Sequence, residues 1–472
     1  MREILESTFR QALAGTHPRE LTARALPDER PALVMALGKA AMTMLEAARE
    51  RFPGVAWLAT PPAPKGAPPT TDAARPPHEP GGSADGGPGP GEREPASGEL
   101  LPGSHPLPDD RSVRAAERAL ERAAALGADD LLLLLVSGGG SALWSAPEHV
   151  DLEAKRRLTT HLQRAGADIS ELNTVRRHLS RVKGGGLLAA TPARVLSLLL
   201  SDVPGDAPWD IASGPGVADP TTFADALDVI RRFPGEATAS AAEAFERGAR
   251  GELPETVKPG STADARSASV VIGSSRTLLA EAAAYLERSL GVQAVVLHHD
   301  LAGEASELAE GHAQVAAALL DGGDARPVLP LLASDPPYVA WRLSRLQGSK
   351  PVALLSGGEA TVTVRGRGSG GRNQEFALAF ALALARRAPE ASVWALSAGS
   401  DGIDGSSDAA GAFVTPDTLA RASERGLDPE AMLRDNDSAG FFRALGDQLV
   451  TGQTGHNLND IRIVLLPPLD PA

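Results

Sequence analysis

Two observations place this chain in the α/β class, with parallel sheets covered by helices on both faces. Apolar runs recur along the chain, among them 31–38 (PALVMALG), 129–144 (DDLLLLLVSGGGSALW) and 193–206 (ARVLSLLLSDVPGD). Helical stretches such as 112–126 (SVRAAERALERAAAL) separate them. Strands buried on both faces read as continuous apolar runs, and their alternation with helices is typical of parallel sheets. Small and polar residues follow these runs, at the strand ends where such folds bind ligands.

The length and a shift in composition predict two domains. The chain has 472 residues, and domains of roughly 100–200 residues allow two to four of them. The segment ETVKPGSTADARS separates two α/β blocks, so we expect a boundary near residue 265. We predict an N-terminal α/β domain over 1–265 with a Rossmann-like parallel sheet, and a second α/β domain over 266–472.

Residues 61–98 differ from the rest of the first domain. They contain 11 Pro and 8 Gly and almost no large apolar residue. Such a segment cannot bury enough surface to offset the entropy lost when it becomes ordered. We therefore predict a disordered surface insertion, because ordinary sequence resumes on both sides of it.

The composition excludes several classes of protein. The formal net charge is −14, whereas binding to nucleic acid needs a basic surface. No apolar run reaches the roughly 18 residues of a membrane span. The acidic N-terminal segment MREILESTFRQAL lacks the apolar core of a signal peptide, so we expect a cytoplasmic protein. The absence of cysteine excludes disulfides, thiolate metal sites and a cysteine nucleophile.

The strongest local signal is the glycine-rich turn at 137–141 (SGGGS), directly after the apolar run LLLLLV. Glycine lets backbone N–H groups approach an anion without a Cβ in the way. A tight β–α turn without a ligand is the alternative interpretation. The chain contains no GxxxxGK[ST] motif, so this turn is not a Walker A loop.

An acidic protein that binds an anion must gather positive charge locally. Lysine is rare, with 6 Lys against 40 Arg, yet Lys39 and Lys183 both stand in glycine-containing turns. Lys183 belongs to a basic cluster over 172–186 that also contains Arg176 and Arg181. A solvated helix face is the alternative interpretation of this cluster.

Carboxylates follow two further apolar runs. Asp202, in the segment SDVPGD, could accept a hydroxyl proton or hold a metal, with helix capping as the alternative. The segment SDGIDGSSDAAG places Asp401, Asp404 and Asp408 within eight residues. Oxygen ligands suit Mg²⁺, and a set of Asx-turns is the alternative there.

Two more glycine-rich segments lie near the C-terminus. Residues 366–371 formally satisfy GxGxxG, but no acidic residue follows at the expected distance in a new strand, so we reject a dinucleotide site as the primary interpretation. Arg372 stands just before a predicted helix, where it can meet a phosphate or a carboxylate. The turn 451–460 (TGQTGHNLND) offers hydroxyls, amides and backbone N–H groups together.

Taken in order, these segments resemble the two-domain bacterial glycerate 2-kinases, whose C-terminal part is the MOFRL domain. Each segment is unspecific alone, but the ordered set is specific and places the MOFRL region at about 350–465. The matching segments are ALGKAAM, GSHPLPD, VSGGGSAL, LNTVRRHLSRVKGGGL, LSDVPGD, LSGGEATVTVRGRGSGGRNQEFAL, SAGSDGIDGSSDAAGA and TGQTGHNLNDI.

The resemblance implies phosphorylation of D-glycerate to 2-phosphoglycerate with ATP and Mg²⁺, in a cleft between two α/β domains. Glycerate and ATP are then the partners, without nucleic acid or membrane, and a homodimer is left open. The expected catalytic residues are Lys39, Arg372, Asp202 and Asp401. The residues expected to bind ATP are Ser137, Gly138, Gly139, Gly140, Ser141, Lys183, Gly184, Gly185, Gly357, Gly358, Glu359, Asn373, Thr454 and Asn457. The residues expected to bind the substrate are His105, Arg176 and Arg181, and those expected to bind the metal are Asp401, Asp404 and Asp408.

Two other functions stay open on the sequence alone. A hydroxypyruvate reductase, a name sometimes attached to this family, needs an NAD(P) site, and the GxGxxG stretch here stands in the wrong context. A non-catalytic nucleotide-binding protein would not need both rare lysines together with the acidic cluster.

Overall fold

The computed structural model describes residues 1–64 and 98–469, which form two compact units. The N-terminal unit is Pro18–Ile272, and the C-terminal unit combines Gly273–Ala472 with Met1–His17. The predicted insertion at 61–98 lies outside the described residues, apart from its first four positions and its last.

The division differs from the expected boundary near residue 265 in one main respect, the placement of helix α1 (Arg2–Gly15). This helix buries Leu5 and Phe9 in the same apolar cluster as Leu279 and Leu286 of α11 (Ser275–Leu290). The amphipathic pattern of α1 was visible in the sequence, but the pattern alone does not say which core the apolar face joins.

The N-terminal unit is built on a six-stranded sheet with the order β3-β2-β1-β4-β5-β6. The pairs β3–β2, β2–β1, β1–β4 and β4–β5 are parallel. The strands are β1 (Leu33–Leu37), β2 (Ala56–Thr60), β3 (Gly98–Leu100), β4 (Leu131–Val136), β5 (Arg194–Leu200) and β6 (Ser267–Gly273). This order reverses direction between β1 and β4, and ligands of open α/β sheets bind beyond the carboxyl ends of the strands at such a switch point.

Helices cover both faces of this sheet, as the continuous apolar strands predicted. Leu33, Met35 and Leu37 of β1 pack on the side of α4, whereas Val34 and Ala36 pack on the side of α3. The helices of the unit are α2 (Pro18–Ala25), α3 (Ala41–Arg51), α4 (Asp110–Ala124), α5 (Gly140–Leu143), α6 (Leu152–Arg164), α7 (Ile169–His178), α8 (Gly186–Ala190), α9 (Phe223–Arg232) and α10 (Glu236–Ala249). Short 3₁₀ turns occur at Pro204–Asp206, Ile211–Ser213 and Asp264–Arg266.

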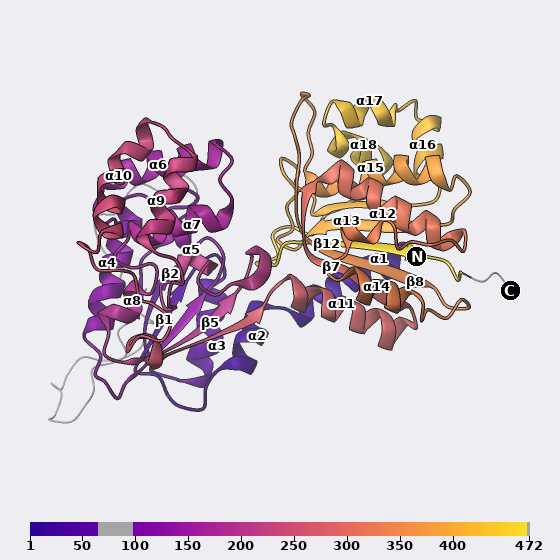
Figure 1. Cartoon of the computed structure of the whole chain (residues 1–472). Helices are drawn as coiled ribbons and strands as arrows, with labels where there is room; N and C mark the ends of the chain where they lie inside the picture. The colour runs from indigo at the N-terminus through magenta and orange to yellow at the C-terminus, as the bar shows by residue number, and fades with distance from the viewer. Residues whose placement is uncertain (65–97, 470–472) are drawn as a thin grey trace. The chain divides into compact units, whose positions relative to one another are not determined.

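Helices α6, α7, α9 and α10 form a separate layer within the N-terminal unit, grouped together in Figure 1. They share an apolar cluster of their own, which includes Leu158, Val175, Phe223 and Phe245. The layer therefore has its own small core, and residues of α6 and α7 line a cavity together with Ser141 and Ala142, which follow the turn after β4.

The C-terminal unit contains a six-stranded mixed sheet with the order β11-β10-β9-β12-β8-β7. Only β7 and β8 pair in parallel among its described strands, and the other neighbours are antiparallel. The strands are β7 (Gln293–Glu304), β8 (Val352–Thr361), β9 (Trp394–Gly399), β10 (Gly411–Val414), β11 (Gln448–Leu449) and β12 (Asp460–Leu466). Sequence reasoning anticipated parallel sheets, but a strand buried on both faces reads as the same apolar run in either direction.

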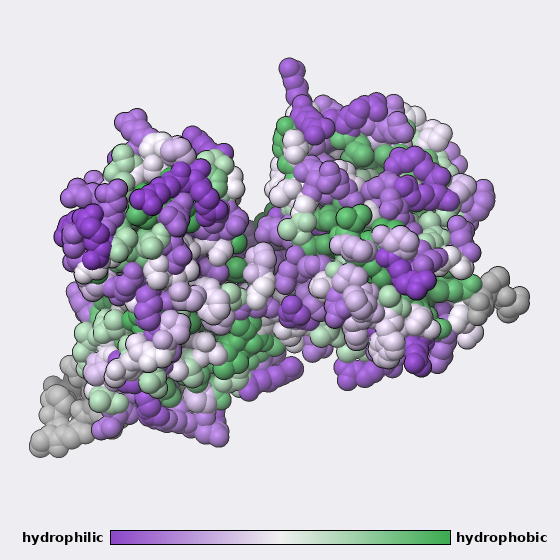
Figure 2. Space-filling view, viewed as in Figure 1, coloured by the Kyte–Doolittle hydropathy of each residue, from purple (hydrophilic) through white to green (hydrophobic). Residues whose placement is uncertain are grey.

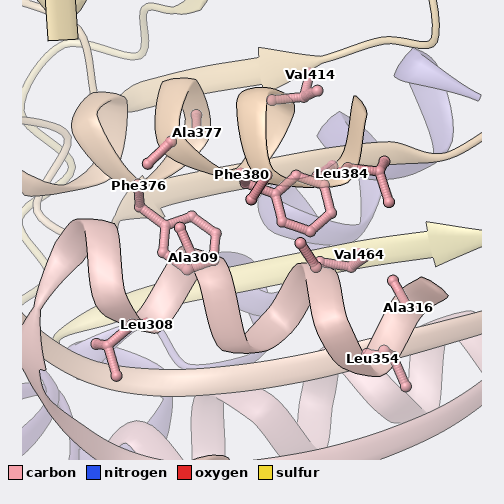
Figure 3. Close-up of a cluster of buried hydrophobic side chains, with 14 of the residues drawn as sticks. Leu308, Ala309, Ala316, Leu354, Phe376, Ala377, Phe380, Leu384, Val414 and Val464 are labelled. Atoms are coloured by element: carbon pink, nitrogen blue, oxygen red, sulfur yellow. The ribbon is translucent and has the colours of Figure 1, made fainter. Parts of the chain in front are cut away.

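The large core of the C-terminal unit lies between its sheet and helices α12 and α15. Figure 3 shows Phe376 and Phe380 of α15 directed toward α12, with Val464 of β12 beside them. The helices of the unit besides α1 and α11 are α12 (Ala305–Leu320), α13 (Leu329–Leu332), α14 (Pro336–Leu343), α15 (Arg372–Arg387), α16 (Thr418–Glu424), α17 (Pro429–Arg434) and α18 (Ser438–Leu445). This packing fixes the first turn of α15, where Arg372 stands.

Polar residues cover most of the molecular face drawn in Figure 2, with smaller apolar areas between them. Within residues 1–64 and 98–469, no helix has the length and apolar character needed to cross a membrane.

Candidate functional site

Lys39 and the glycine-rich turn meet at the carboxyl ends of β1 and β4, the switch point of the N-terminal sheet. The Lys39 amide donates to the Gly138 carbonyl at 2.9 Å, and the Ser137 amide donates to the Leu37 carbonyl at 2.9 Å. The Ser137 hydroxyl accepts a hydrogen bond from the Ala40 amide at 3.0 Å. Ser137 therefore braces the two turns against each other.

Gly38 allows these two turns to approach so closely. Its φ is +119°, and a Cβ at this position would lie 2.3 Å from the Ser137 hydroxyl oxygen and 2.4 Å from the Ser137 carbonyl oxygen. A side chain at position 38 would push the turns apart, and Lys39 would move away from the glycine-rich turn.

The glycine-rich turn presents unused donors beside an unpaired cation. The amides of Gly138, Gly139 and Gly140 have no acceptor among the described residues. The Lys39 ammonium likewise makes no ion pair with any residue in 1–64 or 98–469. Consecutive free N–H groups next to a cation form an anion-binding arrangement.

His105 lies against the same turn. A Cβ on Gly139 would lie 3.1 Å from the His105 ring and 3.5 Å from the Lys39 side chain. Burial lowers the pKa of His105, and the charge of Lys39 lowers it further. The neutral imidazole is therefore favoured, and it can donate or accept a hydrogen bond without adding charge.

Some residues of the basic cluster at 172–186 line a cavity, and others hold the fold together. Arg176 and Lys183 line a cavity beside the glycine-rich turn. Arg181 instead pairs with Glu117 of α4 at 2.9 Å. The Gly184 amide donates to the Ser213 carbonyl at 3.0 Å and the Gly185 amide to Gly214 at 2.8 Å, so these two N–H groups hold the fold together.

Ser141 and Asp202 complete the described polar groups near this edge of the sheet. The hydroxyls of Ser141 and Ser213 are 2.8 Å apart, and Ser213 donates to Asn173 at 3.0 Å. Asp202 follows Ser201 just after β5, which pairs with β4. Asp202 is half-buried.

A second cluster forms in the C-terminal unit around Arg372. Its guanidinium donates to both carboxylate oxygens of Asp460, at 2.7 and 3.0 Å, and pairs with Glu359 at 2.7 Å. Asp460 is fully buried, and the buried Arg462 lies 3.4 Å from it. The two carboxylates raise the pKa of Arg372 against the opposing effect of burial, so its charge is firmly kept.

Asp404 and Asn373 belong to the same network but serve helix α15. The Asp404 carboxylate accepts from the Asn373 and Gln374 amides, both at 2.9 Å, and from both of their side chains. Asn373 is fully buried and also bonds Asp460 and Ser397. Burial raises the pKa of Asp404. Asp404, which we expected to bind the metal, and Asn373, which we expected to bind ATP, are therefore hydrogen-bonded within the protein.

The three aspartates at 401–408 do not come together as a ligand set. The Asp401 side chain closes an Asx-type turn by accepting from the Ile403 amide at 3.1 Å, and Asp408 is exposed. No group of three or more His, Asp or Glu side chains within 1–64 and 98–469 is arranged to hold a metal ion.

The remaining expected ATP ligands occupy structural positions. Gly357 and Gly358 lie inside β8, where a Cβ would collide with Ser275 and with the Leu301 backbone, respectively. The Thr454 hydroxyl donates to the Ser400 carbonyl, and Asn457 lies in the same turn.

Comparisons with known proteins identify the family. Residues 4–246 match the family described as "Domain of unknown function (DUF4147)", and residues 352–460 match the MOFRL family. A protein named as a hydroxypyruvate reductase from Agrobacterium vitis is 42% identical, over 78% of this chain and 77% of its own. A D-glycerate 2-kinase from Thermotoga maritima is 38% identical, over 78% of this chain and 80% of its own. The crystal structure of a glycerate kinase from Thermotoga maritima matches with a TM-score of 0.78 and 32% identity, over 98% of this chain and 99% of that one.

The chain belongs to the two-domain glycerate 2-kinase family. Its DUF4147 region carries Lys39 and the glycine-rich turn, and its MOFRL region begins at β8 and ends at Asp460. Arg372 and its carboxylate partner thus both lie in the MOFRL region of this family member.

Sequence reasoning did not single out Asp460, nor Lys155 and Ser145, which line the same cavity as Arg176 and Lys183. Lys155 is one of the rare lysines, which is a usable signal, but it stands in a run of charges with Arg156 and Arg157, and such a run is typical of a solvated helix face. Asp460 was visible only as the last residue of a turn motif. Ser145 carries no pattern at all.

Proposed function

We propose that this chain is a kinase that transfers the γ-phosphoryl group of ATP to a hydroxyl of D-glycerate. The observation that carries the proposal is the unpaired Lys39 ammonium beside three unused amide donors at the switch point of the sheet. The family relationship supports it, because relatives named as glycerate kinases cover most of the chain.

Phosphoryl transfer spreads negative charge over the γ-phosphate oxygens, so catalysis consists mainly of positioning and charge stabilisation. ATP supplies the phosphoryl group when bound. The amides of Gly138, Gly139 and Gly140 donate to phosphate oxygens, and Lys39 neutralises the charge that develops on them. His105 contacts the acceptor, and Asp202 orients the acceptor hydroxyl. Arg372 is the second cation of the reaction, held in one orientation by Asp460.

Mg²⁺ is part of the expectation, but the described residues do not provide a dedicated site. The Asp404 carboxylate oxygens accept hydrogen bonds from the first turn of α15, and Asp401 and Asp408 do not form a metal-ligand group with Asp404. Mg²⁺ commonly binds through substrate phosphates with only one or two carboxylates. We therefore assign no step of the reaction to protein-held metal.

A specific observation disfavours the reductase alternative. The GxGxxG stretch in the C-terminal unit packs against the turn at 435–437, where a Cβ on Gly366 would lie 2.2 Å from the Asp435 carbonyl oxygen. The amides of Arg365, Gly366 and Ser369 donate to side chains of that turn. The amides of Gly366, Gly368 and Gly370 are thus used within the protein and are not available to a pyrophosphate.

The test is direct. The protein is incubated with ATP, MgCl₂ and D-glycerate, and ADP is measured, with hydroxypyruvate and NADH in a parallel reaction. Phosphorus NMR of the product then reports the position of the phosphate. We expect ADP formation that depends on D-glycerate and a signal from 2-phosphoglycerate. NADH oxidation without ADP formation would overturn the proposal.

A further inference from the structure

A cavity of about 300 Å³ lies in the N-terminal unit between α5, α6, α7 and the loop before α4. Four of its lining residues are cations, Lys155, Arg156, Arg176 and Lys183, and none of the described residues that line it is acidic. In a protein of net charge −14, this gathering of one sign in one enclosed space calls for an anion.

Two of these cations are deeply buried. Lys155 is 5% exposed and Lys183 is 2% exposed. The Lys155 ammonium donates to the Leu179 carbonyl at 2.7 Å, and the Lys183 ammonium donates to the carbonyls of Ser141 at 2.8 Å and Trp144 at 2.7 Å. Neither forms an ion pair with the residues that the structure describes, although an ammonium has three donors. Burial lowers the pKa of both ammonium groups, so an anion in the cavity would supply the counter-ion that keeps them protonated.

Ser145 adds an independent sign of a missing ligand. Its side chain lines the same cavity and is 1% exposed, yet its hydroxyl has no hydrogen-bond partner among the described residues. A buried hydroxyl without a partner costs free energy, so native structures rarely retain one without cause.

The cavity adjoins the arrangement assigned to phosphoryl transfer. Pro106 lines the cavity and directly follows His105, whose ring contacts Gly139. Ser141 also lines it and directly follows Gly140. The cavity therefore borders the glycine-rich turn, within reach of a small ligand bound in it. The volume is at the lower end of the range for small-molecule sites, which is about 300–1,000 Å³.

We propose that this cavity binds the carboxylate of the hydroxy acid, with Lys155, Arg176 and Lys183 as its counter-charges and Ser145 as a hydrogen-bond donor. The proposal rests on the proposed function and assigns the substrate's carboxylate to one place. A compact carboxylate suits a small basic cavity, and it leaves Lys39 and the glycine amides free for the phosphoryl group.

The test measures the KM for D-glycerate at saturating ATP, and the calorimetric Kd of D-glycerate and of ATP separately, in wild type and Lys155→Met. Methionine keeps the volume and removes the charge, and the Leu179 carbonyl keeps its other donor, the Glu148 amide at 3.2 Å. Arg157→Met is the matched control, because this cation on the same helix is exposed and outside the cavity. Glycerol, which lacks a carboxylate, is the ligand control.

We expect Lys155→Met to raise the KM and Kd for D-glycerate at least about tenfold, as loss of a charge-assisted hydrogen bond does, while the Kd of ATP changes less than about twofold. Arg157→Met should change neither, and glycerol should not bind. Ser145→Ala should weaken D-glycerate binding by a smaller factor in the same direction. An unchanged D-glycerate Kd in Lys155→Met, or weakening of ATP alone, overturns the proposal.

The two proposals fail in different ways. A wild-type protein that forms no ADP from D-glycerate and does not bind it refutes both. Normal turnover of D-glycerate with an unchanged KM in Lys155→Met and Ser145→Ala refutes the cavity assignment alone and leaves the kinase intact.

Discussion

The backbone amide of Lys39 donates to the carbonyl of Gly138 at 2.9 Å, which ties a lysine-bearing turn to the glycine-rich turn of the neighbouring strand. This bond uses the backbone only, so the Lys39 ammonium is left unpaired among the described residues. The position of the cation is thus set by the fold rather than by a salt bridge, and its charge stays available to a ligand.

Replacement of Lys39 tests this assignment. We expect Lys39→Ala to lower kcat by about 100-fold or more, the range that a single electrostatic group supplies. The Tm should stay close to wild type, because the exposed side chain makes no hydrogen bond or ion pair with the described residues. Lys39→Arg should restore little activity, since a planar guanidinium does not reproduce a compact ammonium. Steady-state kinetics and thermal unfolding give both readouts, and near-normal kcat in Lys39→Ala would contradict the assignment.

Gly38 is the residue that lets the Lys39 turn approach the glycine-rich turn, because a side chain there would collide with Ser137. We expect Gly38→Ala to destabilise the N-terminal unit by about 2–4 kcal/mol, the sum of a forced contact and an unfavourable positive φ. Gly166→Ala is the matched control, because Gly166 also has a positive φ of +89° but no atom within 4 Å of its would-be Cβ. Urea unfolding gives the free energy of unfolding of both variants. The difference between their losses is the part due to the steric contact with Ser137, because both share the cost of a positive φ. Equal losses would show that the close approach at Gly38 is unimportant.

Much of the N-terminal site could be predicted from the sequence, because its parts are local. The apolar run at 131–136 and the glycines after it specify a strand followed by a turn, and Lys39 stands in the same context after its own strand. What the pattern could not provide was the order of the strands. Only the placement of β1 beside β4 brings Lys39 and Gly138 together.

The C-terminal cluster was less predictable, because it depends on distant pairings. Arg372 was recognisable before its helix, but its partner Asp460 is 88 residues away and reaches it through β12. For Asn373 the sequence instead suggested a ligand contact that the structure does not leave available. An amide in a glycine-rich segment suggests a ligand contact, yet here the protein itself satisfies it through Asp404, Asp460 and Ser397.

The pairing of Arg372 with Asp460 leads to a prediction about geometry rather than charge. Arg372→Lys keeps the positive charge but lacks the planar fork that makes two parallel hydrogen bonds to Asp460, so we expect kcat to fall by about 100-fold. Arg365→Lys, at an exposed position of the same segment, should leave kcat near wild type. Steady-state kinetics with D-glycerate and ATP measure both. Full activity in Arg372→Lys would show that charge alone suffices there.

The buried ammonium of Lys155 should make the stability of the N-terminal unit depend on pH. Burial first, and then the charge of Arg176, lower the pKa of Lys155 from the 10.5 of an exposed lysine to about 7, against an opposing effect of Glu148. The groups that face it are Arg176 and Lys183 across the cavity, Glu148 before its helix, and Glu153 and Arg156 on its own helix. Burial also lowers the pKa of Lys183 well below that of an exposed lysine.

Between pH 7 and 10.5 the unfolded chain holds the Lys155 proton and the folded chain has released it. Stability therefore rises with pH across this window, and below pH 7 the full cost of burying the charge is present. Lys155→Met removes that cost, so we expect its Tm to exceed that of wild type at pH 6 and the difference to shrink as the pH approaches 10.5. Thermal unfolding of both proteins without ligand, at pH 6, 8 and 10, measures the difference. Arg157→Met should show no such trend, and a Tm difference that stays constant with pH would mean that Lys155 does not lose its proton within this window in the folded protein.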